Sequence, residues 1–559
     1  MARPPNAWKR AVPTGAARLR NAAARLQNAV VRFLPGDRPA WVVLELHGAF
    51  PARRRTRRLL SPDRFLGSAQ EVSQEAFEAQ VTALLDAPWV EGVVVRLGDL
   101  SVGLATALAL RTQLERLRTG GKRLIVHAAE LNHASYLLAT AADEIIAPEG
   151  ATMQVTGMAV TNTFMAEGLN RFGVRFEKLA IEEFKNAGDT FALPAMSEAQ
   201  RAQTDALLDS IEQSYLETVG AARGHTPAAV RDWIDRGVPS AEEARDLGMI
   251  DRVAYEDEAI GERHAKYAGA ARFLPARVPP RAPERVAVVS LEGTIVPGTS
   301  RRLPVPVPLL GRALAGSETL VRALRAAERD PTTAAVVLYV DSGGGSALAS
   351  DLIWRAVQRL AARKPVVAVM GAVAGSGGYY VLTHATRVLA GPTTITGSIG
   401  VVMGKFVFEE FNTRYGLNPE TLQRGRFATL TTSARGWDPD ERELLHRHND
   451  AIYQRFVNRV ADGRGLSPAR VNEIGRGRLW SGRDALDVGL VDELGDVATA
   501  VALAKERAGL HPDAPTWNVQ APEAPVLPNT QDPTTLARAF TPLLREQAWL
   551  VDPARVRID

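Results

Sequence analysis

A serine between glycines is the residue in this chain best suited to chemistry. Ser376 lies in the stretch GAVAGSGGYY, residues 371–380, between an apolar run at 365–370 that predicts a buried strand and residues 381–386, which predict a helix. Glycines at such a turn let the backbone adopt positive φ and approach a ligand closely. A hydroxyl there, with backbone N–H groups beside it, suits a nucleophile with an oxyanion site. The alternative is a packing turn in which the serine only caps the helix.

A nucleophilic serine needs a base, and no histidine is obviously placed for this role. His384 lies eight residues after Ser376 on the predicted helix, where it would point elsewhere. Lys185 is the better candidate, because only eight of the 67 basic residues are lysines and each one departs from the usual choice of arginine. A buried lysine can lose its proton, whereas arginine cannot. A Ser–Lys pair can therefore replace a Ser–His pair; the alternative is an ordinary exposed lysine.

An internal repeat runs through most of the chain. Similar residues recur at an offset of 243, which drifts to 245 near the start and to 241 near the end, as loop insertions would cause. One offset that holds over about a hundred residues indicates a duplication. The pairs that share the offset of 243 are Val93 and Val336, Tyr136 and Tyr379, Gly157 and Gly400, and Phe184 and Phe427.

The repeats differ at the candidate catalytic positions. The first repeat lacks the serine and the glycine loop of the second repeat, whereas the second repeat lacks the lysine of the first. Each half thus carries one part that the other has lost, which favours a pairing of Ser376 with Lys185. The corresponding positions are Ser376 and His133, Ser398 and Val155, 341–345 (DSGGG) and 98–102 (GDLSV), and Lys185 and Ala428.

The elements that position these residues predict an α/β fold. Short apolar runs at 41–46, 92–97 and 124–128 predict strands, and 104–117 has the period of a helix. The same order of elements restarts after a proline-rich segment. In the C-terminal part, six prolines between 512 and 533 predict an extended linker, and 534–550 predicts a short helix. The predicted units are an N-terminal segment (1–38), a first domain (39–272), a linker (273–284), a second domain (285–510) and a C-terminal extension (511–559).

Composition excludes several classes of function. With 46% hydrophobic and 23% charged residues, the 559-residue chain is globular, and its net charge of +4 gives no reason to expect nucleic-acid binding. It has no cysteine, so disulfides and thiolate metal sites are excluded. No metal-binding or nucleotide-binding signature occurs, so we expect no metal and no cofactor. The hydrolase elbow G-x-S-x-G is not met, because Ala374 stands at its first glycine.

The N-terminal segment has the pattern of a membrane-surface helix. Residues 1–35 hold basic but no acidic side chains, and Leu19, Leu26 and Phe33 form an apolar stripe beside arginines. The apolar run is too short to span a membrane. The alternative is a helix packed on its own protein. Two arginine-rich loops at 53–60 and 301–310 could add a lipid-facing rim, or they could simply be solvated.

Four motifs give the chain a family resemblance over about residues 39–510. It resembles the long, tandem-repeat signal peptide peptidases of the S49 family of serine peptidases, whose fold is similar to Clp protease and crotonase domains. The motifs are GAVAGSGGYY at 371–380, TGSIG at 396–400, VDSGGGS at 340–346 and LWSGRDALDVGLVDELGD at 479–496.

The resemblance implies a role for each candidate residue. Ser376 would be the nucleophile, Lys185 the general base, and Ser398 the residue that holds the lysine. The backbone N–H groups of Gly344, Gly345 and Gly377 would bind the oxyanion. The implied protein is a membrane-associated homotetramer that degrades cleaved signal peptides and other unstructured, membrane-derived peptides. A crotonase-like acyl-CoA enzyme and an inactive membrane scaffold stay open as alternatives, as does a dyad formed between chains.

Overall fold

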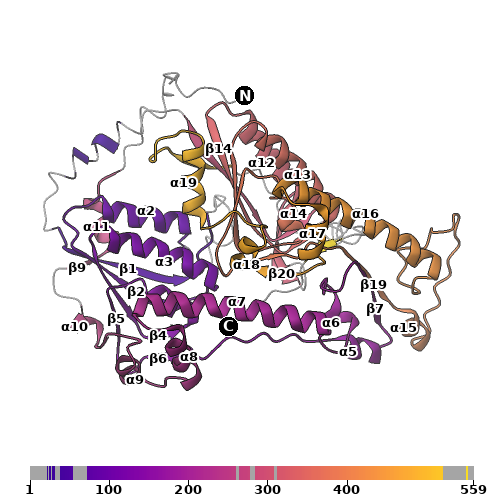
Figure 1. The fold of residues 1–559 in the computed structure, drawn as a ribbon, viewed down its shortest axis with the longest axis horizontal. Coiled ribbons are helices and arrows are strands. Elements are labelled where there is room, and N and C mark those ends of the chain that lie inside the picture. Colours follow the sequence, from indigo (N-terminus) through magenta and orange to yellow (C-terminus); the bar gives the residue numbers. More distant parts are fainter. Residues whose placement is uncertain are drawn as a thin grey trace, which may run out of the picture.

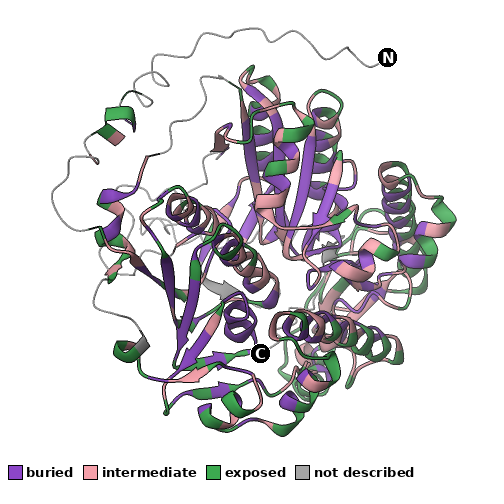
Figure 2. Ribbon diagram, turned by 60° about the vertical axis from the view of Figure 1, so that its left-hand side comes forward, coloured by how far each residue is buried: buried purple, intermediate pink, exposed green. Residues whose placement is uncertain are grey.

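The computed structural model describes residues 38–53, 72–259, 264–276, 284–307, 311–519 and 549–551, with seven further residues between 22 and 31. Two sheets of mainly parallel strands dominate the molecule, each covered by helices (Figure 1). In Figure 2 the strands of both sheets are largely buried, and the exposed residues lie mainly on the outer helices. This layered α/β arrangement is the fold class that the alternating strand and helix patterns predict.

The first sheet has the strand order β8-β5-β3-β2-β1-β9, and all its pairings are parallel. Its central strands bury both faces, as in Val93–Val95, which is why they are continuous β-branched runs rather than alternating ones. The strands are β1 (Trp41–Gly48), β2 (Gly92–Leu100), β3 (Arg123–Ala128), β5 (Glu144–Ala147), β8 (Arg252–Val253) and β9 (His264–Lys266), and nearby helices are α2 (Gln74–Leu85), α3 (Leu104–Thr119) and α4 (His133–Ala139).

The second sheet repeats this plan in the order β20-β18-β16-β14-β10-β22, with β17 paired to β16 and β21 paired to β17. Its central run, Val366–Met370, is buried on both faces in the same way. The strands are β10 (Arg285–Glu292), β14 (Thr333–Ser342), β16 (Val366–Gly375), β17 (Arg387–Ala390), β18 (Ile395–Gly397), β20 (Leu479–Ser481), β21 (Glu493–Leu494) and β22 (Thr516–Asn518), and the helices around it include α12 (Ser317–Arg329), α13 (Ala347–Ala361), α14 (Gly377–Tyr380) and α19 (Val497–Arg507).

The duplication extends to individual hydrogen bonds. The buried Tyr136 hydroxyl donates to the Met249 carbonyl at 2.9 Å, and its counterpart Tyr379 donates to the Leu490 carbonyl at 2.8 Å. A 26-residue helix follows in each repeat, α7 (Glu198–Arg223) and α16 (Pro439–Arg464), and each ends at a glycine with positive φ. In Figure 1, α7 runs along the lower side of the molecule from α8 (Pro227–Arg236) to α6 (Asp189–Ala192).

A third sheet joins the two repeats. Strand β7 (Arg175–Ala180) of the first repeat pairs antiparallel with β19 (Val402–Val407) of the second. The full order is β12-β13-β11-β15-β23-β19-β7. Its other strands are β11 (Thr294–Val296), β12 (Arg301–Val307), β13 (Gly311–Gly316), β15 (Gly344–Ser346) and β23 (Trp549–Val551). The remaining elements are β4 (Glu130–Asn132), β6 (Thr152–Gln154), α5 (Ala166–Arg171), α9 (Ala241–Asp246), α10 (Glu256–Ala259), α11 (Tyr267–Ala270), a 3-10 turn (Ala271–Phe273), α15 (Glu409–Arg414), α17 (Pro468–Ile474) and α18 (Gly482–Asp487).

Three local predictions were wrong. The helix after Ser376 is α14, which ends at Tyr380, and 381–386 form turns. Residues 301–307 form strand β12, because they pair with β13, rather than a loop. In the C-terminal extension, Trp549 and Leu550 belong to strand β23 and not to a helix, while 534–548 lie outside the described residues. The domain limits stay predictions; β22 adds a strand to the second sheet after residue 510.

The proposed membrane-facing segments lie only partly within the described residues. Leu19, Phe33 and 54–60 lie outside them, whereas Leu26 is described and is 68% exposed. Asn28 exchanges two hydrogen bonds with the backbone of Ala276, at 2.8 and 2.7 Å. Arg53 is buried against Glu75 at 2.8 Å, so it does not face lipid as expected. Within the described ranges, no helix combines the length and apolarity needed to cross a membrane.

Candidate active site

Ser376 occupies a sharp turn between β16 and α14. Its φ is 52°, a left-handed value that is strained for a residue with a side chain and is found mainly at functional sites. Two backbone bonds hold the turn: the Ser376 N–H donates to the Gly397 carbonyl at 2.8 Å, and the Tyr380 N–H donates to the Ser376 carbonyl at 2.8 Å. A Cβ at Gly378 would collide with the Ser342 carbonyl, so the glycine there is a packing requirement. Ser376 itself is completely buried.

Lys185 of the first repeat contacts Ser376 of the second repeat within one chain. The distance from Lys185 Nζ to Ser376 Oγ is 2.8 Å, and Nζ also lies 2.8 Å from the hydroxyl and 3.2 Å from the carbonyl oxygen of Ser398. All three contacts are to neutral oxygens. Lys185 is 1% exposed and Ser398 2% exposed, so the cluster is shielded from bulk water. Three residues predicted from sequence alone thus lie together.

The segment that carries Lys185 is held by strands of both repeats. It follows β7, and the pairing of β7 with β19 continues as the Ile181 N–H donates to the Val401 carbonyl at 3.1 Å. The Phe184 N–H then donates to the Arg476 carbonyl at 3.2 Å. A Cβ at Gly477 would collide with the Lys185 backbone, which explains a glycine at this close approach. The backbone of Lys185 is thereby fixed against the second repeat.

A buried polar network behind Lys185 was not predicted. Lys178 Nζ donates to the Lys185 carbonyl at 2.7 Å and forms an ion pair with Asp189. Asn186 Nδ2 donates to the other Asp189 oxygen at 2.9 Å, and Gln203 of α7 donates to Asn186. Asp189 is 3% exposed. The scarcity of lysine, which singled out Lys185, applied equally to Lys178 and could have found it.

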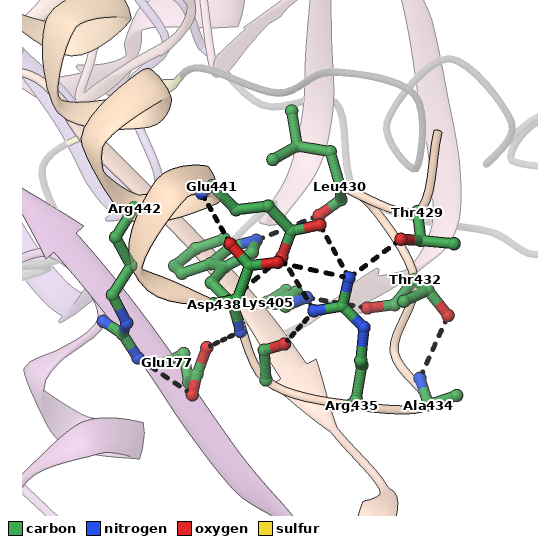
Figure 3. Close-up of polar contacts among 12 residues, drawn as sticks. Glu177, Lys405, Thr429, Leu430, Thr432, Ala434, Arg435, Asp438, Glu441 and Arg442 are labelled. Atoms are coloured by element: carbon green, nitrogen blue, oxygen red, sulfur yellow. Dashed lines mark hydrogen bonds and ion pairs between the residues drawn. The ribbon is translucent and has the colours of Figure 1, made fainter. Parts of the chain in front are cut away.

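The other end of β7 is fixed by an ionic cluster at the start of α16 (Figure 3). Glu177 of β7 accepts from the Trp437 N–H at 2.8 Å and lies 3.0 Å from the Arg442 guanidinium. Beside it, the two terminal guanidinium nitrogens of Arg435 each donate a hydrogen bond to a carboxylate oxygen of the buried Glu441, both at 2.8 Å. The Arg435 guanidinium holds the pKa of Glu441 below its usual range. These contacts tie β7 to the second repeat at both of its ends.

The predicted oxyanion glycines lie beside the serine turn, and the N–H group of one of them is already engaged. The Gly344 N–H donates to the Ser342 hydroxyl at 3.1 Å, so it can serve an oxyanion only by leaving or sharing that bond. Gly345 lies opposite Ile295 of β11, and its backbone, at φ 156°, leaves no room for a Cβ. Gly377 is the first residue of α14, where an N–H has no acceptor within the helix.

The corresponding place in the first repeat is packed as core. His133, which stands where the second repeat has Ser376, accepts from the Gly157 N–H at 2.9 Å through Nε2. Its ring packs against Tyr215 at a centroid distance of 5.1 Å. Burial lowers the pKa of His133, which favours the neutral ring that this acceptor role requires. The first repeat therefore supplies the lysine and a structural histidine, as the complementary pattern of losses suggested.

Comparison with known proteins places the chain in a family. The profile of peptidase family S49 matches twice, at 116–269 and 358–511; the matches begin 242 residues apart, which confirms the duplication. A serine protease SPPA of Arabidopsis thaliana chloroplasts is 30% identical over 440 residues, covering 76% of this chain but only 64% of that protein. Protease 4 of Haemophilus influenzae is 28% identical over 452 residues, covering 75% of this chain and 71% of that protein.

Among solved structures, a ClpP1 mutant from Listeria monocytogenes covers 38% of this chain and 94% of its own, at 14% identity and a TM-score of 0.25, which is too low to carry an argument. The family assignment rests on the two profile matches, which together span more than half of the sequence and contain Lys185 in the first and Ser376 in the second. The chain belongs to peptidase family S49.

Proposed function

We propose that this protein is a serine endopeptidase in which Ser376 is the nucleophile and Lys185 the general base. The observation that carries the proposal is the 2.8 Å contact between Lys185 Nζ and Ser376 Oγ, made by two fully buried side chains. A base must lie within hydrogen-bond reach of the proton that it removes, and this pair meets that condition. The names of the S49 relatives, both called proteases, support the same class of reaction.

Burial supports a neutral Lys185 as the active form, because desolvation penalises the charged ammonium. In that form two Nζ–H groups donate to the hydroxyl and carbonyl oxygens of Ser398, and the nitrogen lone pair faces the Ser376 hydroxyl. Lys185 takes the hydroxyl proton as Oγ attacks a peptide carbonyl, and then returns that proton to the departing amine. A water molecule hydrolyses the resulting ester by the reverse sequence, which restores Ser376.

The oxyanion of each tetrahedral intermediate is stabilised by backbone N–H groups. Gly377 offers one from the single turn of α14. The glycine loop offers the other once Gly344 releases or shares its bond with the Ser342 hydroxyl. This arrangement needs neither a metal nor a cofactor.

The alternatives differ from this proposal in their need for the dyad. An acyl-CoA enzyme of the crotonase type uses a similar backbone oxyanion site but has no use for a serine paired with a lysine. An inactive scaffold would have no reason to hold Lys185, Ser376 and Ser398 within hydrogen-bond distance. The peptidase is therefore the function that the geometry supports best.

For substrates, we propose cleaved signal peptides and other unstructured, membrane-derived peptides, following the resemblance of the motifs. A membrane contact through residues 1–35 belongs to the same proposal, and the exposed Leu26 supports it. The homotetramer is likewise proposed from the resemblance.

Hydrolysis assays on three substrates test the function. We expect the purified protein to cleave an unstructured apolar peptide and to spare a folded domain that contains the same segment, because cleavage at Ser376 needs extended backbone. A fluorophosphonate should add one phosphonyl group, found by peptide mass mapping on Ser376. Turnover of an acyl-CoA thioester without peptide cleavage would point to the crotonase alternative, and no turnover of either would point to the scaffold.

Replacing Asp189 with asparagine is expected to lower kcat by about 10²-fold and to change KM less than twofold. The change leaves the half-buried Lys178 without its carboxylate, and the Lys185 carbonyl, which accepts from Lys178, then loses a fixed partner. A catalytic group displaced by about 1 Å can lose activity on this scale. Asp189→Glu should restore part of the rate, and Asp205→Asn, on the exposed face of α7, is the matched control. A proportional loss of folded protein, with normal kcat in what remains, would reveal a purely structural role.

A further inference from the structure

Tyr380 joins the serine turn to the helix that follows the glycine loop. It is the last residue of α14, four residues after Ser376, and its hydroxyl donates to Asp351 Oδ1 at 2.7 Å. Asp351 lies on α13, which begins directly after the loop that holds Gly344 and Gly345. Burial raises the pKa of Tyr380, so its hydroxyl keeps the proton that it donates to the carboxylate. One side-chain hydrogen bond therefore connects the two segments that would supply the oxyanion N–H groups.

Polar contacts to two further segments surround this bond. The guanidinium carbon of Arg459, on α16, lies 3.6 Å from the centre of the Trp354 ring, and Arg459 Nε lies 4.0 Å from Asp351 Oδ1. Trp354 Nε1 donates to His384 Nδ1 at 2.9 Å, in the turns after α14. Burial lowers the pKa of His384, which favours the neutral ring that can accept this bond. Helix α13 is thus tied to α16 and to both ends of the segment around Tyr380.

The first repeat shows that the fold does not require this cluster. At the offset of 243, Leu137 stands where the second repeat has Tyr380, and it is buried in the core. Leu108 stands in the place of Asp351 and packs against the same core. By contrast, both repeats keep the bond from the neighbouring tyrosine hydroxyl, that of Tyr379 in the second repeat, to a backbone carbonyl. The remaining members of the cluster are also replaced in the first repeat: Trp354 by Arg111, His384 by Ala141 and, between the two long helices that begin 241 residues apart, Arg459 by Thr218. The cluster therefore occurs only in the repeat that has the serine and the glycine loop.

We propose that Tyr380 and Asp351 are positioning residues, whose hydrogen bond holds the Gly377 turn and the glycine loop at the spacing that an oxyanion requires. The inference rests on the proposed peptidase function and extends it to residues outside the dyad and the oxyanion loop. Gly377 and Tyr380 are the two ends of one short helix, and the glycine loop leads directly into the helix of Asp351. An oxyanion bonds to both segments only in the transition state, so a shift of either segment raises the barrier without weakening substrate binding.

Tyr380→Phe tests the proposal in the full-length chain. Phenylalanine keeps the ring and removes only the hydroxyl, so kcat for peptide cleavage should fall about 30-fold while KM changes less than about twofold, because small displacements of catalytic groups cost rate on this scale. The inhibition constant of a peptide aldehyde, which forms a tetrahedral hemiacetal with Ser376, should rise by a similar factor. The matched control is Tyr136→Phe, which removes a buried tyrosine hydroxyl bond from the first repeat. That variant should lower the melting temperature and leave kcat unaltered.

Substitutions at Asp351 separate positioning from packing. Asp351→Asn keeps an oxygen that can accept from the Tyr380 hydroxyl, so kcat should stay within about threefold of the unchanged protein. Asp351→Leu should lose as much rate as Tyr380→Phe, and the two changes together should cost no more than one of them, because both break the same bond. The double variant Tyr380→Leu/Asp351→Leu carries the residues of the first repeat, so it should fold and yet lose about 30-fold in kcat.

The outcomes distinguish this inference from the proposed function. A Tyr380→Phe variant with unchanged kcat, or one whose loss of rate matches its loss of folded protein, would overturn the positioning role and leave the peptidase in place. Losses at Tyr380 and Asp351 that simply multiply would also overturn it, since the two side chains would then not act through one bond. If the unchanged chain cleaved no peptide, the proposed function would be wrong and the positioning role with it.

Discussion

Ser376→Ala is expected to lower kcat for peptide cleavage by about 10⁵-fold or more, because loss of the nucleophile removes covalent catalysis and leaves only binding and oxyanion stabilisation. Folding should be unaffected, since the strained turn is held by backbone bonds to Gly397 and Tyr380 and not by the side chain. Initial rates at saturating peptide and thermal denaturation curves measure the two effects.

The matched control is Ser350→Ala. Ser350 is also fully buried, but its hydroxyl donates at 2.8 Å to the carbonyl of Ser346, the residue that caps the start of α13, and not to Lys185. That variant should keep its kcat within a factor of two. If Ser376→Ala retained a tenth of the normal rate, the serine would not be the nucleophile, and the Ser–Lys contact would need another explanation.

Replacing Lys185 with either methionine or arginine is expected to lower kcat/KM by about 10⁴-fold, comparable to the upper range for loss of a general base. Methionine removes the base while preserving an unbranched side chain. Arginine keeps the positive charge but cannot release its proton, so it cannot accept one from Ser376. Lys266→Arg, at an exposed position beside Glu45, controls for the substitution itself. An active Lys185→Arg enzyme would mean that the lysine supplies only charge.

The dependence of kcat/KM on pH tests the same hypothesis, because a lysine base predicts the direction of the change. The base form of Lys185 is the deprotonated one, so kcat/KM should rise with pH as the buried ammonium loses its proton and then reach a plateau. Initial rates measured at a series of pH values from neutral to alkaline test this direction. A rate that falls with rising pH over this interval would contradict the assignment.

Much of the candidate site could be predicted because its signals are local or repeated. The glycines around Ser376 predict a turn in which the backbone can adopt positive φ. The offset of 243 shows which candidate residue each repeat lacks. Because each repeat lacks the candidate residue that the other has, Lys185 and Ser376 can be predicted to pair before the fold of the chain between them is known. The structure places their side chains 2.8 Å apart.

The parts that escaped prediction depend on contacts between distant segments. Nothing in the sequence of β7 says that it will pair with β19, and Asp189 acquires its role only because Lys178 reaches it across a turn. Arg53 looked like a lipid-facing arginine because its partner Glu75 comes from a separate helix. The three residues of β23 form a strand only through neighbours some two hundred residues earlier in the chain.

The pairing of β7 with β19 has a consequence for biosynthesis. The ribosome completes the lysine-bearing half long before the serine-bearing half leaves the exit tunnel, so under the proposed mechanism a growing chain has its base before it has its nucleophile. The proposed dyad can form only after both halves have emerged and β7 has paired with β19. Under that mechanism the unfinished chain could not cleave itself during translation.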